Sequence, residues 1–550
     1  MDYKKEYKRW LDNVKDSELL EQLKGMDDKA QEDAFYRDLE FGTAGLRGVI
    51  GAGSNRMNRY VVARASQGIA NYLGKGKSVV IGYDSRIKSD FFAKVAASVF
   101  AANGLKVHLW SELNPVPTVS FAVRYLKADA GVMITASHNP SKYNGYKVYG
   151  SDGCQITTEA ADTILSIIDK LDLFADVKTV DFDSAVSTGE IKYIPAVVMD
   201  AFIENVKAQS VLFGDKINHD VAIVYSPLNG TGLKPVTRAL SECGFTNVTV
   251  VEEQRKPDGN FPTCPYPNPE IREAMKLGLM YCEKTGADLL LATDPDADRC
   301  GIAVKAPEGY RLLTGNETGI LLLDFICSQR KKHNRMPKNP VFVKTVVTMD
   351  LAEKIASSYG VETVNVLTGF KFIGEVIAKL EKAGRVDDYI LGFEESYGYL
   401  TGSYVRDKDA VDAALMICEM FAYYKTRGIS LLEKLNEIYS KFGYCLNTLH
   451  SYQFEGSSGM AVMADIMKRF HVGLESLAGR KVEKTLDYSK GIDGLPPSEV
   501  LKYYFSDGSL VIRPSGTEPK LKAYISVTAK DRAEAEKVEK VISDELNEII

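Results

Sequence analysis

The sequence has few of the residues that bind structural metal ions or form disulfide bonds. Of its 550 residues only 6 are His, and its 8 Cys are scattered without a C-x-x-C pair. The histidines show no H-x-x-x-H pairing, so a zinc site is not expected. A chain of this length can bury a large core without disulfides, and free cysteines are typical of a reducing compartment.

Long apolar runs and an excess of positive charge are also missing. No apolar run reaches the roughly 18 residues that a membrane span needs. A net charge of −6 provides no basic surface for nucleic acid. The first 25 residues are charged and helical in pattern, without the apolar core of a signal peptide. We therefore expect a cytoplasmic protein with small-molecule partners.

Alternating strand and helix patterns are what the sequence has in abundance. Short apolar, β-branched runs occur at 79–84, 221–227, 287–294, 340–347 and 389–396, and amphipathic stretches such as 90–104 separate them. This alternation is typical of α/β domains with parallel sheets and helical crossovers. The last hundred residues differ, because 509–527 indicates two strands around a turn and a helix follows. We predict three mixed α/β domains and a smaller α+β domain, over 1–200, 201–325, 326–445 and 446–550.

The segment DPDADR (294–299) places three carboxylates at alternate positions after an apolar run. Asp294, Asp296 and Asp298 would repel one another strongly unless a cation lies between them. Oxygen ligands without His or Cys favour Mg²⁺ over zinc. Arg299 stands at the sixth position, where a calcium loop of the EF-hand type needs Gly. The alternative is a solvated acidic turn.

The segment TASHNP (135–140) follows a second apolar run, GVMIT. Ser137 would then lie at the carboxyl end of a strand, where α/β proteins bind ligands, and its hydroxyl could attack phosphorus. Taken singly, Ser137 could be a turn residue, His138 a structural side chain and Lys147 a surface charge. Together with a Mg²⁺ loop they are the groups that phosphoryl transfer requires.

A candidate anion site lies near the end of the chain, in VIRPSGTEP (511–519). Arg513 offers a two-pronged donor, and the turn of Ser515, Gly516 and Thr517 can direct hydroxyls and backbone N–H groups at a phosphate. A capped hairpin turn with a surface Arg is the alternative.

TASHNP with NGYK, DPDADR, GFEES and RPSGTEP, in this order over some 380 residues, resemble the motifs of the α-D-phosphohexomutase superfamily. FGTAGLRG (41–48) extends the resemblance toward the start of the chain. The length and the TGFKF segment are most similar to the phosphoglucomutase/phosphopentomutase branch.

The resemblance implies a heart-shaped molecule of four domains, each contributing one loop to a central cleft. Ser137 would carry a phosphoryl group, and Mg²⁺ would be held by that group with Asp294, Asp296 and Asp298. Arg47 and Arg299 would lie near the reaction centre, with Lys147 or His138 as general base. Sugar and distal phosphate would be bound by Thr368, Gly369, Lys371, Glu394, Ser396, Lys408, Arg513, Ser515, Gly516, Thr517 and Lys522. Lys522 departs from the family, which often has Arg there.

The implied activity is the interconversion of glucose 1-phosphate and glucose 6-phosphate, with glucose 1,6-bisphosphate as intermediate and activator. Mannose or pentose phosphates are the alternative substrates. A phosphoserine hydrolase would have no need of a second anion site far along the chain, and a non-catalytic sugar-phosphate sensor would be expected to lose the nucleophile or a metal carboxylate. We expect a monomer or weak dimer.

Overall fold

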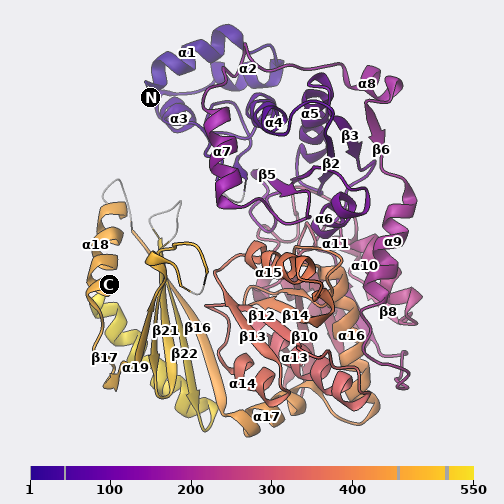
Figure 1. Ribbon diagram of the computed structural model, residues 1–550, viewed down its shortest axis with the longest axis vertical. Coiled ribbons are helices and arrows are strands. Elements are labelled where there is room, and N and C mark those ends of the chain that lie inside the picture. Colours follow the sequence, from indigo (N-terminus) through magenta and orange to yellow (C-terminus); the bar gives the residue numbers. More distant parts are fainter. Residues whose placement is uncertain (1, 43–44, 455–458, 493, 515–519) are drawn as a thin grey trace.

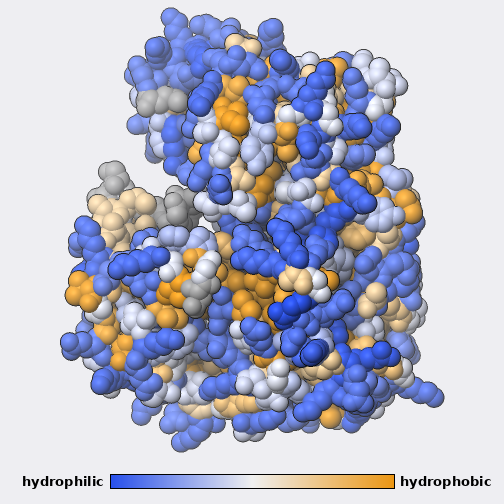
Figure 2. Space-filling model, viewed as in Figure 1, coloured by the Kyte–Doolittle hydropathy of each residue, from blue (hydrophilic) through white to orange (hydrophobic). Residues whose placement is uncertain are grey.

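The computed structural model describes residues 2–42, 45–454, 459–492, 494–514 and 520–550. Its elements form four main sheets, and we name domains I to IV after them (Figure 1). Domain I forms an upper lobe in this view, and a notch separates it from domain IV at the lower left (Figure 2). In the part of the chain that is described, no helix has the length and apolar character needed to cross a bilayer.

The sheet of domain I is mixed. Its order is β1 (Leu46–Val49), β5 (Tyr143–Gly150), β4 (Ala130–Ile134), β2 (Ser78–Tyr83), β3 (Lys106–Leu109) and β6 (Ile191–Tyr193). Strands β4, β2, β3 and β6 are parallel, whereas β5 runs antiparallel to both β4 and β1. The helices of this domain are α1 (Tyr3–Asn13), α2 (Ser17–Lys24), α3 (Asp28–Phe35), α4 (Arg59–Leu73), α5 (Ser89–Ala102), α6 (Val116–Tyr125), α7 (Thr158–Ile168) and α8 (Phe182–Thr188).

Domains II and III repeat the mixed design. The sheet of domain II is β11 (Gly309–Leu313), β10 (Cys300–Ala306), β9 (Leu289–Thr293), β7 (Ile223–Ser226) and β8 (Val248–Val250); its helices are α9 (Ala196–Lys207), α10 (Leu233–Glu242), α11 (Glu252–Arg255) and α12 (Arg272–Thr285). The sheet of domain III has the order β13 (Glu362–Val366), β12 (Val341–Thr345), β14 (Tyr389–Glu394) and β15 (Gly398–Leu400). The helices of domain III are α13 (Gly315–Lys332), α14 (Leu351–Ser358), α15 (Phe370–Lys382), α16 (Ala410–Thr426) and α17 (Leu431–Phe442). One hydrophobic core runs through both domains.

Domain IV is built differently, because its main sheet is antiparallel throughout. The order is β16 (Tyr444–Gln453), β22 (Lys520–Ala529), β21 (Gly508–Pro514), β20 (Leu501–Phe505) and β19 (Lys484–Asp487). Helix α19 (Arg532–Ile549) packs on β16 and β22, and the domain also contains α18 (Gly459–Val472) and the short pair β17 (Ser476–Leu477) and β18 (Arg480–Lys481). The predicted fold class, three mixed α/β domains and one α+β domain, is therefore confirmed.

Several loops that leave the carboxyl ends of parallel strands carry the residues singled out from the sequence. Ser137 follows β4, Asp294 follows β9 and Glu394 ends β14. All three strands are buried along their whole length, so the first polar side chains occur where the strands end. This is the edge at which open α/β sheets bind ligands.

Candidate functional site

A single cavity of about 600 Å³ is lined by residues of all four domains. The predicted site residues among its lining are Arg47, Ser137, His138, Lys147, Asp298, Arg299, Thr368, Gly369, Glu394, Ser396, Lys408, Arg513 and Lys522. Lys371 is not part of the lining, and its ammonium lies over the ring of Phe372. Ser515, Gly516 and Thr517 fall outside the described residues.

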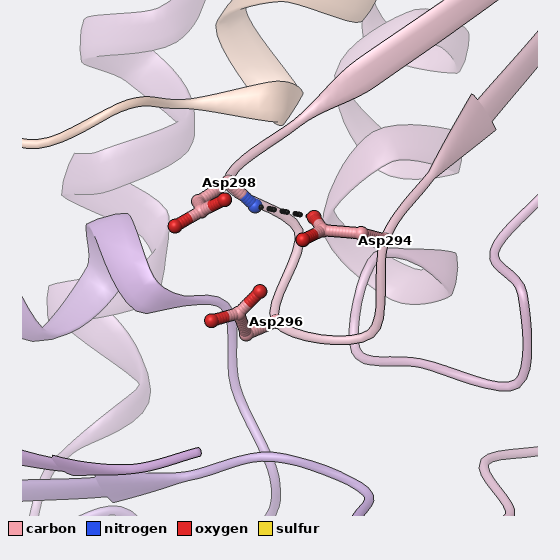
Figure 3. Close-up of side chains that lie close together, drawn as sticks. All are labelled: Asp294, Asp296 and Asp298. Carbon is pink, nitrogen blue, oxygen red and sulfur yellow. Dashed lines mark hydrogen bonds between the residues drawn. The ribbon is translucent and has the colours of Figure 1, made fainter. Parts of the chain in front are cut away.

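Asp294, Asp296 and Asp298 lie on the loop between β9 and β10, and their carboxylates face a common space (Figure 3). One oxygen from each lies within 4.8 Å of the others, and all three side chains are buried. Oδ1 of Asp294 accepts hydrogen bonds from the amides of Asp298 at 3.1 Å and Arg299 at 2.9 Å, which fixes the loop. The tight spacing predicted from the sequence is thus present in the fold.

The chemistry of this cluster fits a metal ion. Oδ1 of Asp296 and Oδ1 of Asp298 are buried and have no hydrogen-bond partner among the described residues. Burial, followed by the charges of Asp296 and Asp298, raises the pKa of Asp294 well above its usual value. A cation between these oxygens would satisfy both orphaned acceptors and remove the repulsion. The three carboxylates could therefore hold a metal ion.

Ser137 lies directly against this cluster. Its Oγ donates a hydrogen bond to Oδ2 of Asp294 at 2.9 Å and lies 3.1 Å from Nδ1 of His138. The backbone has a φ of 51° at Ser137, in the left-handed region that non-glycine residues rarely adopt. Its amide donates to Oγ1 of Thr135 at 2.8 Å. The domain I loop thus presents a hydroxyl to the carboxylate loop of domain II.

Two lysines complete the surroundings of the carboxylates. Lys147 is buried on β5 and is not a surface charge, and its Nζ lies 3.0 Å from Asp296 and 3.3 Å from Asp298. Burial alone would lower the pKa of Lys147, but these two carboxylates outweigh it and the pKa is raised. Lys408, expected at the distal phosphate, contacts Asp298 at 3.1 Å.

His138 and Arg299 form another part of the wall. Burial, together with the positive charges of Arg299 and Arg47, lowers the pKa of His138 well below its usual value. The guanidinium of Arg299 pairs with Glu270, and Arg47 donates to Oδ1 of Asn139 at 3.1 Å. The imidazole beside Ser137 is therefore neutral near pH 7 in this arrangement.

The predicted sugar-binding residues come from two neighbouring loops of domain III. The amide of Gly369 donates to Oε1 of Glu394 at 2.9 Å, which joins the loop before α15 to the end of β14. Gly369 has a φ of 120°, a conformation that glycine alone adopts readily. Oγ1 of Thr368 is buried without a partner among the described residues. The hydroxyl of Thr368 and the carboxylate of Glu394 can therefore bind a polar ligand.

Domain IV brings a pair of cations to the opposite wall. Arg513 on β21 is the direct register partner of Lys522 on β22, and both line the cavity. Burial, then the neighbouring charges of Arg513 and Lys520, lowers the pKa of Lys522. Two like charges on adjacent strands repel each other unless an anion lies between them. This wall is suited to a phosphate.

Sequence reasoning missed several residues that support these groups. Asp84 follows β2, and its Oδ2 lies 2.6 Å from Oγ1 of Thr135, which itself lies 3.0 Å from Asp296. Asp407 accepts from Tyr149 at 2.8 Å and from Nζ of Lys408 at 3.2 Å. The rule that located Ser137, a polar residue at the end of a buried strand, would also have found Asp84.

Comparison with known proteins assigns the class. Models of the phosphoglucomutase/phosphomannomutase family match its domain I over residues 38–174, domain II over 200–309, domain III over 314–442 and the C-terminal domain over 461–544. A phosphoglucomutase of Staphylococcus saprophyticus is 36% identical over 540 residues, 95% of this chain and 96% of that protein, and one of Staphylococcus aureus (strain MRSA252) is 35% identical over 540 residues, 95% of each.

Solved structures agree on the fold. Parafusin, a phosphoglucomutase from Paramecium, matches with a TM-score of 0.70 at 20% identity, over 94% of this chain and 95% of that one. A phosphoglucomutase/phosphomannomutase family protein from Burkholderia thailandensis matches with a TM-score of 0.67 at 20% identity, over 92% and 97%. The fold and site define an enzyme of the phosphosugar mutase class. The chain belongs to the phosphoglucomutase/phosphomannomutase family.

Proposed function

We propose that this protein is a phosphoglucomutase that interconverts α-D-glucose 1-phosphate and glucose 6-phosphate through a phosphoserine at position 137. One observation carries the proposal. A buried serine that donates at 2.9 Å to a carboxylate cluster shares one cavity with the cation pair Arg513 and Lys522. Two separate anion sites allow one phosphate to be held while the other reacts.

The reaction proceeds in two transfers. The free hydroxyl of the bound sugar phosphate attacks the phosphorus on Ser137, the bond from phosphorus to Oγ breaks, and glucose 1,6-bisphosphate forms. The bisphosphate turns end for end, and Oγ of Ser137 then takes the other phosphoryl group. Of the two candidate bases, His138 accepts the hydroxyl proton and returns it, a role typically worth about 10² to 10⁴ in rate. The pKa of Lys147 is raised, so this side chain stays protonated and contributes positive charge.

Asp294, Asp296, Asp298 and the phosphate on Ser137 would hold Mg²⁺, which supplies positive charge to the transferring group when bound. Arg47 and Arg299 add to that charge, Thr368, Glu394 and Ser396 bind sugar hydroxyls, and Arg513 with Lys522 holds the distal phosphate. The 36% identity to the Staphylococcus saprophyticus phosphoglucomutase supports glucose as the preferred sugar. Glucose 1,6-bisphosphate as activator and a monomeric or weakly dimeric state remain predictions.

A coupled assay tests the proposal. Glucose 1-phosphate, mannose 1-phosphate and ribose 1-phosphate are compared on the native chain and on Ser137→Ala, with trace glucose 1,6-bisphosphate and Mg²⁺. We expect the highest kcat/KM with glucose 1-phosphate and loss of nearly all turnover in the variant. Substantial mutase turnover by Ser137→Ala would refute the phosphoserine mechanism. Release of inorganic phosphate as the main product would indicate a hydrolase, and binding without turnover a sensor.

A further inference from the structure

The loop that carries Ser137 is held from beneath by one buried guanidinium. Arg86 lies three residues beyond β2, and its side chain is fully buried. Its Nη1 donates to the carbonyl oxygens of Pro140 at 3.0 Å and Tyr143 at 2.9 Å, its Nε donates to that of Ser137 at 3.2 Å, and its Nη2 donates to those of Ser137 and Asn139. A guanidinium has five N–H groups, so every one is used on this loop.

The conformation of Ser137 needs such a hold. A non-glycine residue at a φ of 51° is strained by roughly 1–3 kcal/mol and persists only where its surroundings fix it. Arg86 binds the carbonyl of Ser137 itself and those of three residues that follow it. The turn that aims Oγ at Asp294 is therefore fixed by a side chain that does not itself line the cavity.

Arg86 also connects this loop to domain II. Its guanidinium lies over the ring of Phe261, 5.1 Å from the ring centre, and Phe261 is itself buried. Nearby, a Cβ at Gly259 would lie 2.4 Å from the amide nitrogen of Ile87 and 2.7 Å from the carbonyl carbon of Arg86, so the two backbones are in direct contact. The same domain carries the carboxylates that face Ser137.

We propose that Arg86, whose guanidinium packs against Phe261, is a positioning residue that fixes the Ser137 loop of domain I in place relative to the carboxylate loop of domain II. The proposal rests on the function proposed above. Arg86 acts through Ser137 and does not touch the substrate. A Lys at this position keeps the charge but has only three N–H groups on a flexible stem, so it cannot bind the same set of carbonyls.

The first test separates kcat from KM. Misplacing a reacting group by about 1 Å can cost about 10²-fold in rate. We expect Arg86→Lys to lower kcat for glucose 1-phosphate by about that factor, with KM within about threefold, because Arg513 and Lys522 are not disturbed. Phe261→Leu should lower kcat by about 2- to 30-fold, the range of one cation–π contact. The matched control is Arg64→Lys in the same domain, whose ion pair with Asp38 lies away from the cavity, and its kcat should not change.

The second test does not depend on activity, so it distinguishes failure of this proposal from failure of the proposed function. Amide hydrogen exchange over 135–145 should become at least about tenfold faster in Arg86→Lys and stay at the native rate in Arg64→Lys. The reason is that this loop opens more easily only when its carbonyl oxygens lose their hydrogen bonds to Arg86. Unchanged exchange over this segment in Arg86→Lys, or equal loss of kcat in Arg64→Lys, would overturn the proposal. If Arg86→Lys does not fold, Phe261→Leu gives the same two measurements.

Discussion

Replacement of Asp350 by Asn tests how domain IV is held against domain III. The carboxylate of Asp350, just before α14, accepts from Nζ of Lys502 at 2.6 Å and from Oγ of Ser509 at 2.6 Å. Both donors belong to domain IV, on β20 and β21. Lys344 of β12 lies 3.4 Å from the same carboxylate. One side chain thus joins two domains at the wall of the cavity.

The size of the effect follows from the charges. Burial acts to raise the pKa of Asp350, but Lys502 and Lys344 outweigh it and lower the pKa to about 2. The difference between this pKa and the usual value of 3.8 corresponds to about 2.5 kcal/mol of stability, which is present above pH 3.8 and is lost as the pH falls toward 2. Asn would also leave the ammonium of Lys502, only 2% exposed, without its charged partner. We therefore expect Asp350→Asn to weaken the domain contact by about 2–4 kcal/mol.

Hydrogen exchange is the suitable assay, because both tryptophans, Trp10 and Trp110, belong to domain I and would not report on domain IV. A loss of 2–4 kcal/mol corresponds to exchange about 30- to 1000-fold faster at the amides of β20 and β21. KM for glucose 1-phosphate should rise as well, since Arg513 and Lys522 lie on the same sheet. Glu353→Gln is the control, because Glu353 pairs only with Lys344 of domain III among the described ion pairs. Unchanged exchange in Asp350→Asn would refute this reasoning.

Further predictions concern a buried acid, the metal site and the distal phosphate site. Burial raises the pKa of Glu419 to about 7, so the stability that this carboxyl contributes is present below pH 4.5 and is lost as the pH rises to 7. Calorimetry should show the free energy of unfolding of Glu419→Gln rising by about 3 kcal/mol relative to that of the native chain between pH 4.5 and 8. A difference that stays constant with pH would contradict this. Asp296→Asn should raise the Mg²⁺ concentration for half-maximal activity more than about 100-fold, since even supporting residues of metal sites are worth 10- to 100-fold; an unchanged Mg²⁺ titration would contradict the metal assignment. Arg513→Ala should lower kcat/KM by about 10- to 150-fold, the value of a charge-assisted hydrogen bond, and a change under threefold would remove Arg513 from the phosphate site.

Helices and strands were predictable where the spacing of apolar residues is typical of one kind of element. The run at 287–294 predicts a strand, and β9 occupies 289–293; the stretch 90–104 predicts a helix, and α5 occupies 89–102. The rule for strand ends located Ser137 and Asp294 because both follow strands that are buried along their length. The predicted domain boundaries near 200, 325 and 445 remain predictions.

Contacts between domains were not predictable in the same way. Lys147 reads as part of a polar segment in the sequence, yet β5 buries it because Asp296 and Asp298 of another domain supply its counter-charges. The partners of Lys408 and Arg86 likewise depend on segments 110 and more than 50 residues away in the chain. Local patterns carry no information about which loops a four-domain fold brings together, so these pairs required the structure.

Transfer of label from the enzyme tests the central claim most directly. The native chain is phosphorylated at Ser137 with ³²P, freed of excess reagent and mixed with unlabelled glucose 1-phosphate and Mg²⁺. If the account is correct, the label leaves the protein and appears first in glucose 1,6-bisphosphate and then in glucose 6-phosphate. Label that stays on the protein while glucose 6-phosphate accumulates, or that is released as inorganic phosphate, would contradict it.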